Sequence, residues 1–141
     1  QGSVALTRSI KEKTSQKQEQ PTNEDYPMMI LTKPITEKLR ANSLRNQIAD
    51  DDAMSTKPVV KLFGGGACTW LLSELDSGGI AFGLCDLGHG SPELGYVSMD
   101  ELMSIRFPPF GLPIERDRHF TPKKTLVEYA EEAREYGMIN A

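Results

Sequence analysis

The sequence predicts an α+β fold, in which a small antiparallel sheet of about four to five strands is accompanied by three helices. Three strand-like runs follow one another over residues 58–87 with only short connections between them, which argues against parallel βαβ units. Helix-start signals stand near residue 32, at residue 98 and at residue 125. These signals predict an N-terminal helix, a short middle helix and a C-terminal helix.

The chain is long enough for one domain plus a tail. It has 141 residues, of which 38% are hydrophobic and 26% charged. Residues 1–28 are rich in Gln, Lys, Glu, Ser and Thr and show almost no apolar periodicity, so they are expected to form a disordered tail, or in part to be a cloning remnant. Residues 29–141 are expected to form a single α+β domain.

The first helix is predicted to start at "TKPITEKL". Thr32 can cap it, and Pro34 stands in the first turn, where its missing N–H matters least. The spacing of the apolar residues predicts a rough stripe facing the core, made of Ile35, Leu39, Leu44 and Ile48.

The sheet is predicted from strand-like runs at 58–63, 68–75, 80–87 and 94–98. "DSGG" at 76–79 is typical of a hairpin turn, because glycine adopts the positive φ that tight turns need. "GGG" at 64–66 is expected to link the first two runs flexibly. It lacks the spacing of a phosphate-binding loop.

The last third of the chain carries two capping boxes and a further strand. "SMDE" at 98–101 predicts the start of the middle helix, and "TLVE" at 125–128 predicts the start of the last helix, which Gly137 is placed to end. "FPPFGLP" breaks the middle helix. "IERDRHF" at 114–120 then alternates like a strand, with Ile114, Arg116, Arg118 and Phe120 on one side.

Charge and composition restrict the classes of partner. Residues 1–57 carry nine Lys/Arg against eight Asp/Glu, whereas residues 58–141 carry seven against twelve. The acidic second part lacks the basic surface that neutralises phosphates, so binding to a nucleic-acid backbone is not expected. No apolar stretch is long enough to span a bilayer, and two cysteines make no disulfide framework. These features predict a cytoplasmic protein without membrane association.

Three segments, "TWLLSELD", "FGLCDLGHGSPELGYVSMDELMSIR" and "GLPIERDRHFTPKKTLVE", carry a family resemblance. The chain resembles an uncharacterised bacterial family, catalogued as a domain of unknown function and frequent on conjugative plasmids and other mobile elements. The motifs ELGYxSxxEL and GLPIERD carry the match, which extends over roughly residues 29–135. The resemblance implies no established reaction, and its setting implies plasmid maintenance, transfer or evasion of host defences.

The charged run after the Gly-Leu-Pro turn is the first candidate site. On an extended strand Glu115, Asp117 and His119 would share one face and Arg116 the other. Neighbours on one face lie about 7 Å apart, too far for a compact active site without groups from other segments. Three interpretations stay open: a structural latch in which Glu115 and Arg116 pair with Arg106 and Glu101, a partner-binding edge, or a catalytic cluster.

The loop at 86–96 is the second candidate, since it presents Asp86, His89, Glu93 and Tyr96 among glycines. A zinc site is not expected, because the two cysteines and two histidines lack the close spacing of structural zinc sites. Cys68 and Cys85 are expected to be buried free thiols on one face of a hairpin.

Two functions follow from these candidates. The first is a non-catalytic accessory domain that binds a protein partner, needs no cofactor or metal, and uses His89, Glu93, Tyr96, Glu115, Arg116, Asp117 and His119. The alternative is a metal-assisted enzyme acting on nucleotides or nucleic-acid ends, using Glu93, Glu115, Asp117 and His119. The sequence favours the first and does not predict an oligomeric state.

Overall fold

The computed structural model describes residues 30–49 and 55–141. The predicted tail, residues 1–28, lies outside them. The described elements are the helices α2 (Lys33–Ala49), α3 (Met99–Ser104) and α4 (Leu126–Tyr136), and the strands β1 (Val60–Gly64), β2 (Cys68–Leu75), β3 (Ile80–Asp86), β4 (Glu93–Ser98) and β5 (Glu115–Arg116). None of these helices combines the length and the apolar character needed to cross a membrane.

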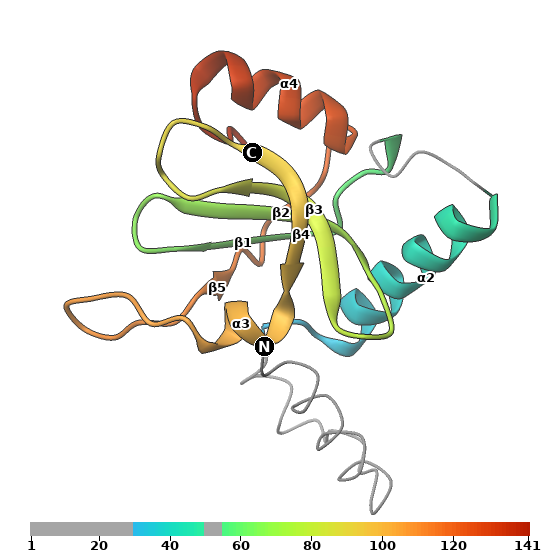
Figure 1. Ribbon diagram of the computed structural model, residues 1–141, viewed down its shortest axis with the longest axis horizontal. Coiled ribbons are helices and arrows are strands. Elements are labelled where there is room, and N and C mark those ends of the chain that lie inside the picture. Colours follow the sequence, from blue (N-terminus) through green and yellow to red (C-terminus); the bar gives the residue numbers. More distant parts are fainter. Residues whose placement is uncertain (1–29, 50–54) are drawn as a thin grey trace, which may run out of the picture.

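The strands form one five-stranded antiparallel sheet in the order β4-β3-β2-β1-β5 (Figure 1). Strands β1 to β4 are consecutive hairpins, while β5 returns from the far side to pair with β1. At the predicted 76–79 turn, Asp76 Oδ1 accepts hydrogen bonds from the backbone N–H groups of Gly78 and Ile80. The predicted α+β fold, with three helices in the expected places, is confirmed.

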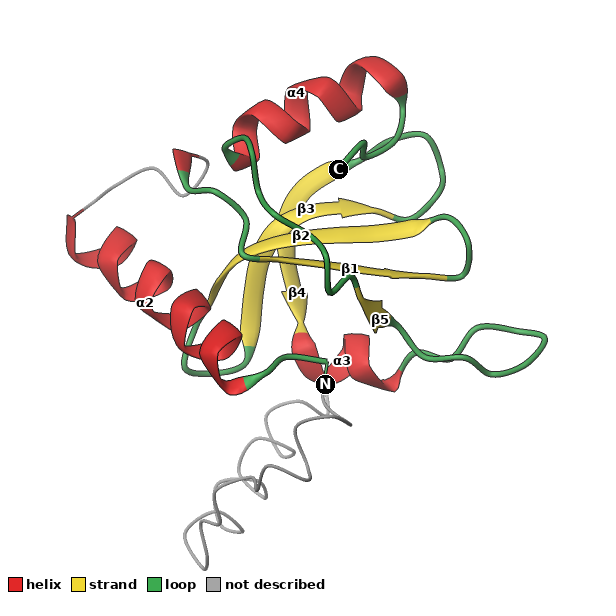
Figure 2. Ribbon diagram, turned by 180° about the vertical axis from the view of Figure 1, so that it is seen from behind, coloured by secondary structure: helices red, strands yellow, loops and turns green. Residues whose placement is uncertain are grey.

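Helices cover both faces of the sheet (Figure 2). Alternation along β2 explains why: Trp70 and Leu72 pack on the side of α2 and α3, whereas Leu71 packs on the side of α4. The first core is completed by Leu39 and Leu102, and the second is completed by Leu84, Leu126, Tyr129, Ala130, Ala133 and Ile139. The sole tryptophan is therefore a core residue.

The predicted apolar stripe of α2 is wrong in its second half. Ile35 and Leu39 face the sheet, but Leu44 is 58% exposed and Ile48 75% exposed. The polar residues Asn42, Ser43 and Asn46 are buried in their place. The helix therefore meets the sheet through an apolar first half and a polar second half.

A β-bulge in β2 explains the polar half of this contact. Leu72 pairs with Gly83 and Glu74 with Phe82, so Ser73 is the extra residue between them. Asn42 Nδ2 donates to the Ser73 carbonyl at 3.0 Å. An apolar residue at position 42 would leave that buried carbonyl without a partner, which opposes the simple helical pattern.

The helix α4 begins and ends with the predicted caps. Thr125 and Glu128 form the complete predicted capping box, and Gly137 ends the helix with φ 76°. At α3, Ser98 Oγ accepts from the Glu101 N–H, as predicted. At α2, Thr32 Oγ1 accepts from the Ile35 N–H.

The predicted strand at 114–120 is wrong in extent, because β5 has only two residues. Asp117 Oδ1 accepts a hydrogen bond from the His119 N–H at 2.9 Å, and Phe120 N–H donates to the Asp117 carbonyl. An aspartate that bonds the backbone two residues on favours a turn over a strand. The expected alternation from Ile114 to Phe120 is therefore interrupted.

Gly83→Ala tests the close approach of β2 and β3. A Cβ at position 83 would lie 2.0 Å from the Leu71 carbonyl oxygen, a backbone atom that cannot move aside. We expect a loss of at least about 3 kcal/mol in the free energy of unfolding, measured by urea denaturation. Gly95 is paired with Gly83, and a Cβ there would meet nothing within 4 Å. Gly95→Ala is therefore the control and should change stability by about 0.5 kcal/mol or less. Equal losses in the free energy of unfolding of the two variants would contradict the close approach of β2 and β3 at Gly83.

Candidate functional site

An apolar loop projects from the sheet between α3 and β5 (Figures 1 and 2). We call residues 107–112 the projecting loop. Phe110 is 82% exposed and Leu112 is 53% exposed. Large apolar side chains exposed next to each other on a protrusion are typical of an interaction surface.

The projecting loop is closed by its own backbone. Phe107 N–H donates to the Leu112 carbonyl at 2.8 Å, and Leu112 N–H donates to the Phe107 carbonyl at 3.1 Å. Pro108 and Pro109 restrict φ within the loop, and Gly111 takes a positive φ of 67°. The exposed Phe110 is thus carried by a backbone with few alternative conformations.

Phe107 anchors the base of the projecting loop to the turn between β1 and β2. Its ring lies against Gly64 and Gly65: a Cβ at Gly64 would be 2.5 Å from Phe107 Cε2, and one at Gly65 would be 2.6 Å from Phe107 Cδ1. The glycines that were expected to give a flexible link are needed here for close packing. The contact ties the loop to the sheet.

Arg116 forms a structural latch, with a different partner from the one expected. Its guanidinium donates to the Ile30 carbonyl at 2.5 Å and joins β5 to the segment before α2. Arg106 donates instead to the carbonyls of Met103 and Ile105, on its own segment. In the described part of the chain, the only ion pairs are Lys61 with Asp117 and Lys124 with Glu132.

Four of the predicted site residues line one shallow depression beside β5. This depression has a volume of about 640 Å³, and Lys61 and Phe63 form its β1 side. Lys61 Nζ lies 3.6 Å from Asp117 Oδ2. The four predicted residues in its lining are Glu115, Arg116, Asp117 and His119.

The other three predicted residues belong to the opposite edge of the sheet. Glu93 and Tyr96 are on β4, and His89 is exposed in the turn before it. Strands β3, β2 and β1 separate β4 from β5. The seven residues therefore do not make one continuous surface. Glu93 is not brought together with Glu115, Asp117 and His119, as the enzyme hypothesis requires.

Individual residues of the β4 edge have local structural contacts. Tyr96 packs against Phe82 with ring centroids 4.9 Å apart and the ring planes tilted by 54°, while remaining exposed. Asp86 is buried and accepts hydrogen bonds from the N–H groups of Gly88 and Ile139. Asp86 therefore holds the segment after α4 against β3.

Cys68 and Cys85 are free thiols on one face of the hairpin, as predicted, but they are half-buried rather than fully buried. They pack on the α2 side of the sheet. Burial, reinforced by the nearby Glu93 carboxylate, raises the pKa of Cys85 from 9.0 to about 11. Burial also raises the pKa of Cys68, with Asp86 adding to the effect. Within residues 30–49 and 55–141, no group of three or more His, Cys, Asp or Glu side chains is arranged to hold a metal ion.

The sequence interpretation includes the turn and strand at 110–120 in the candidate contact surface, but it treats "FPPFGLP" as a helix break and does not identify Phe110 or Leu112 as contact residues. The signal for the projecting loop was the presence of two phenylalanines and a leucine in a segment without helix or strand periodicity. A core segment would be expected to show such periodicity.

A family model described as protein of unknown function (DUF2958) matches residues 30–140. The chain belongs to this family. The match confirms the predicted resemblance to a domain of unknown function, and the DUF2958 region includes the projecting loop and all five strands. No curated protein and no solved structure matches the chain.

Arg116→Ala tests the latch. Removing the guanidinium leaves the part-buried Ile30 carbonyl without its charged donor, so we expect the free energy of unfolding to fall by about 1–3 kcal/mol. Arg118→Ala is the matched control at an exposed position two residues away, and should cost about 0.5 kcal/mol or less. Urea denaturation of both variants measures the difference. A wild-type stability for Arg116→Ala would exclude the latch.

The raised pKa of Cys85 predicts slow alkylation. In a Cys68→Ser variant at about pH 8, iodoacetamide should modify the folded protein at least about tenfold more slowly than the urea-unfolded protein. The thiol ionises less readily in the folded state, so this group makes stability fall as pH rises from about 9 towards about 11. If the alkylation rate of the folded protein reached half of its maximum below about pH 9, the argument that burial raises the pKa of Cys85 would be wrong.

Proposed function

We propose that this DUF2958 protein is a non-catalytic accessory domain that binds a protein partner through the projecting loop. The supporting observation is Phe110, which is 82% exposed on a loop that its own backbone and Phe107 hold in place. Such a side chain contributes little to the folded monomer, so its exposure is better explained by an intermolecular contact.

The energetics favour binding through this loop. Transfer of a phenylalanine side chain from water to an apolar pocket contributes about 1.5–3 kcal/mol. Much of such a gain is usually lost in ordering a flexible segment. Here the two Phe107–Leu112 hydrogen bonds and the prolines order the loop beforehand, so more of the gain remains as affinity.

The shape and charge of the loop define the partner. A convex apolar tip requires a concave apolar pocket, and the exposed Arg106 at its base favours carbonyl or carboxylate groups at the pocket rim. Glu115, Asp117 and His119 follow the loop in the chain and are proposed to extend the contact. His89, Glu93 and Tyr96 would belong to a separate contact at the β4 edge.

The proposed setting is the bacterial cytoplasm, in a plasmid maintenance or anti-defence system of a mobile element. Support comes from the GLPIERD and ELGYxSxxEL motifs, which resemble a family frequent on such elements, and from two free cysteines, which suit a reducing compartment. The alternative enzyme has less support, because β4 and β5 hold its four expected residues on opposite edges.

Photo-crosslinking tests the docking surface. A benzophenone amino acid replaces Phe110 in one variant and Tyr136, a 63% exposed aromatic on α4, in another. In cells of the native host, the first variant should crosslink to a defined protein that the second does not. The captured protein is then purified and its affinity measured. Phe110→Ser should weaken binding about 30-fold or more, with an unchanged melting temperature.

Tyr136→Ser is the control for loss of an exposed aromatic side chain, and it should bind the captured protein with nearly wild-type affinity. The proposal is wrong if both crosslinkers capture the same proteins, or if Phe110→Ser leaves the measured affinity unchanged.

A further inference from the structure

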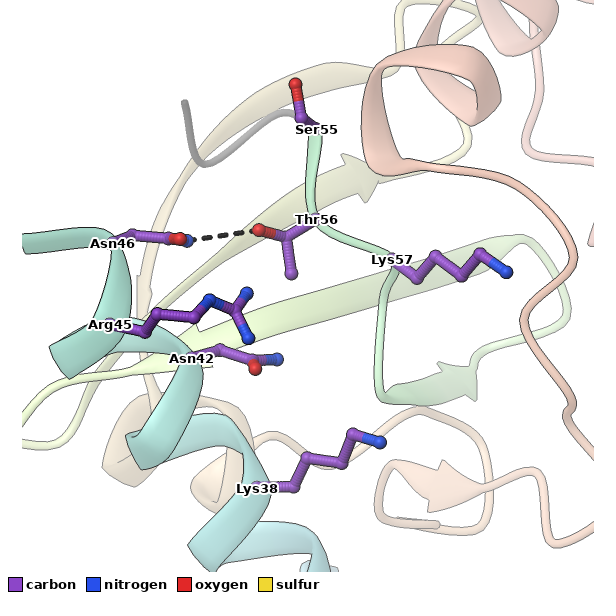
Figure 3. Close-up of a pocket in the computed structure, with 7 residues that line it drawn as sticks. All are labelled: Lys38, Asn42, Arg45, Asn46, Ser55, Thr56 and Lys57. Carbon is purple, nitrogen blue, oxygen red and sulfur yellow. Dashed lines mark hydrogen bonds between the residues drawn. The ribbon is translucent and has the colours of Figure 1, made fainter. Parts of the chain in front are cut away.

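A polar pocket lies between α2, from Lys38 to Asn46, and residues 55–57, which lead into β1 (Figure 3). Its volume is about 490 Å³, within the range of small-molecule sites. It is distinct from the projecting loop and from the β5 depression, which have other lining residues.

Two cations of α2 define the electrostatics of this pocket. Lys38 and Arg45 extend from α2 towards residues 55–57, whereas the Lys57 side chain points away from α2 (Figure 3). Among the described residues, the lining contains no carboxylate, and neither Lys38 nor Arg45 forms an ion pair. Two positive charges at one concave site favour an anion, such as a phosphate group.

Asn46 offers the ligand of this pocket a hydrogen-bond acceptor. It is buried, at 7% exposure, and its Nδ2 donates to Thr56 Oγ1 at 3.0 Å and to Glu74 Oε2 at 2.6 Å. Both amide hydrogens are therefore used, and the buried Oδ1 has no hydrogen-bond partner. Buried polar atoms are normally paired, so this oxygen calls for a donor such as a hydroxyl group.

The contacts behind the pocket fix the orientation of this amide. Glu74 is on β2, just after the bulge, and its carboxylate can only accept from Asn46. The amide nitrogen must therefore point to Glu74 and the oxygen away from it. Cations and an oriented acceptor are thus combined at one site.

We propose that this pocket binds a phosphate ester that carries free hydroxyl groups, such as a sugar phosphate or a nucleotide. Arg45 and Lys38 hold the phosphate, and Asn46 Oδ1 accepts from a hydroxyl group of the sugar. The binding site is independent of the proposed docking through Phe110.

Calorimetry and thermal unfolding of the full chain with ribose 5-phosphate test the proposal, with ribose and inorganic phosphate as comparison ligands. Ribose 5-phosphate should raise the melting temperature and bind at least about tenfold more tightly than inorganic phosphate, while ribose should not bind measurably. The double variant K38Q/R45Q should lose about tenfold or more in affinity for ribose 5-phosphate.

The matched control is K33Q/R40Q, which removes two exposed cations of the same helix that are not in the lining. It should keep the wild-type affinity within about twofold. Equal losses in the two double variants, or equal affinity for inorganic phosphate and ribose 5-phosphate, would overturn the proposal. So would an absence of binding by ribose 5-phosphate at millimolar concentration.

The chain carries three aspartates, residues 50–52, shortly before the pocket-lining residues. A triple Asp→Asn variant at these positions tests whether they compete for the cations. If ribose 5-phosphate binds this variant only, the cations serve the chain's own carboxylates and the proposal is wrong. Binding by wild type and variant alike supports it.

Discussion

The β-bulge at Ser73 is the constraint on which much of this structure depends. It adds one residue to the central strand of the sheet and leaves the Ser73 carbonyl without a ladder partner. Asn42 of α2 supplies the missing donor, and Asn46, one turn later, reaches Glu74 just beyond the bulge. The bulge thereby selects which side of α2 faces the sheet. It also exposes the apolar Leu44 and Ile48.

The same polar contact produces the pocket between α2 and residues 55–57. An apolar helix face would pack closely on β2 and leave no oriented polar groups. The amide side chains of Asn42 and Asn46 hold α2 at hydrogen-bonding distance from β2. Thr56 is a further partner of Asn46. Lys38 and Arg45 then lie at the border of this contact, and their side chains extend towards the segment leading to β1.

The projecting loop depends on close apolar packing, in contrast to the hydrogen-bonded contact between α2 and the sheet. The Phe107 ring is held against the backbone of two glycines, and this contact is possible because neither glycine has a Cβ. The sheet supports the loop at β1 and, through Arg116 and Ile30, connects β5 with the start of α2. One rigid scaffold therefore carries an apolar protrusion and a cationic pocket, whose proposed ligands are a protein and a small phosphate ester.

The sequence by itself determined the features that arise within a few residues of the chain. The hairpin at 76–79, the caps at Thr32, Ser98 and Thr125, and the Gly137 helix end depend on local hydrogen bonds or backbone preferences. The strand-like runs and the short connections between them likewise indicated an antiparallel sheet. These signals were sufficient for the α+β class, because each is decided by neighbours in sequence.

Only the tertiary structure decided which surfaces can act. The return of β5 to pair with β1, rather than with β4, put the two predicted site segments on opposite edges of the sheet. Asn42 and Asn46 are buried because a bulge some 30 residues later in the chain offers them acceptors. Phe107 packs against the glycine turn between β1 and β2, and the loop that it anchors carries the exposed Phe110. Each outcome depends on a contact between segments distant in sequence, which local patterns do not encode.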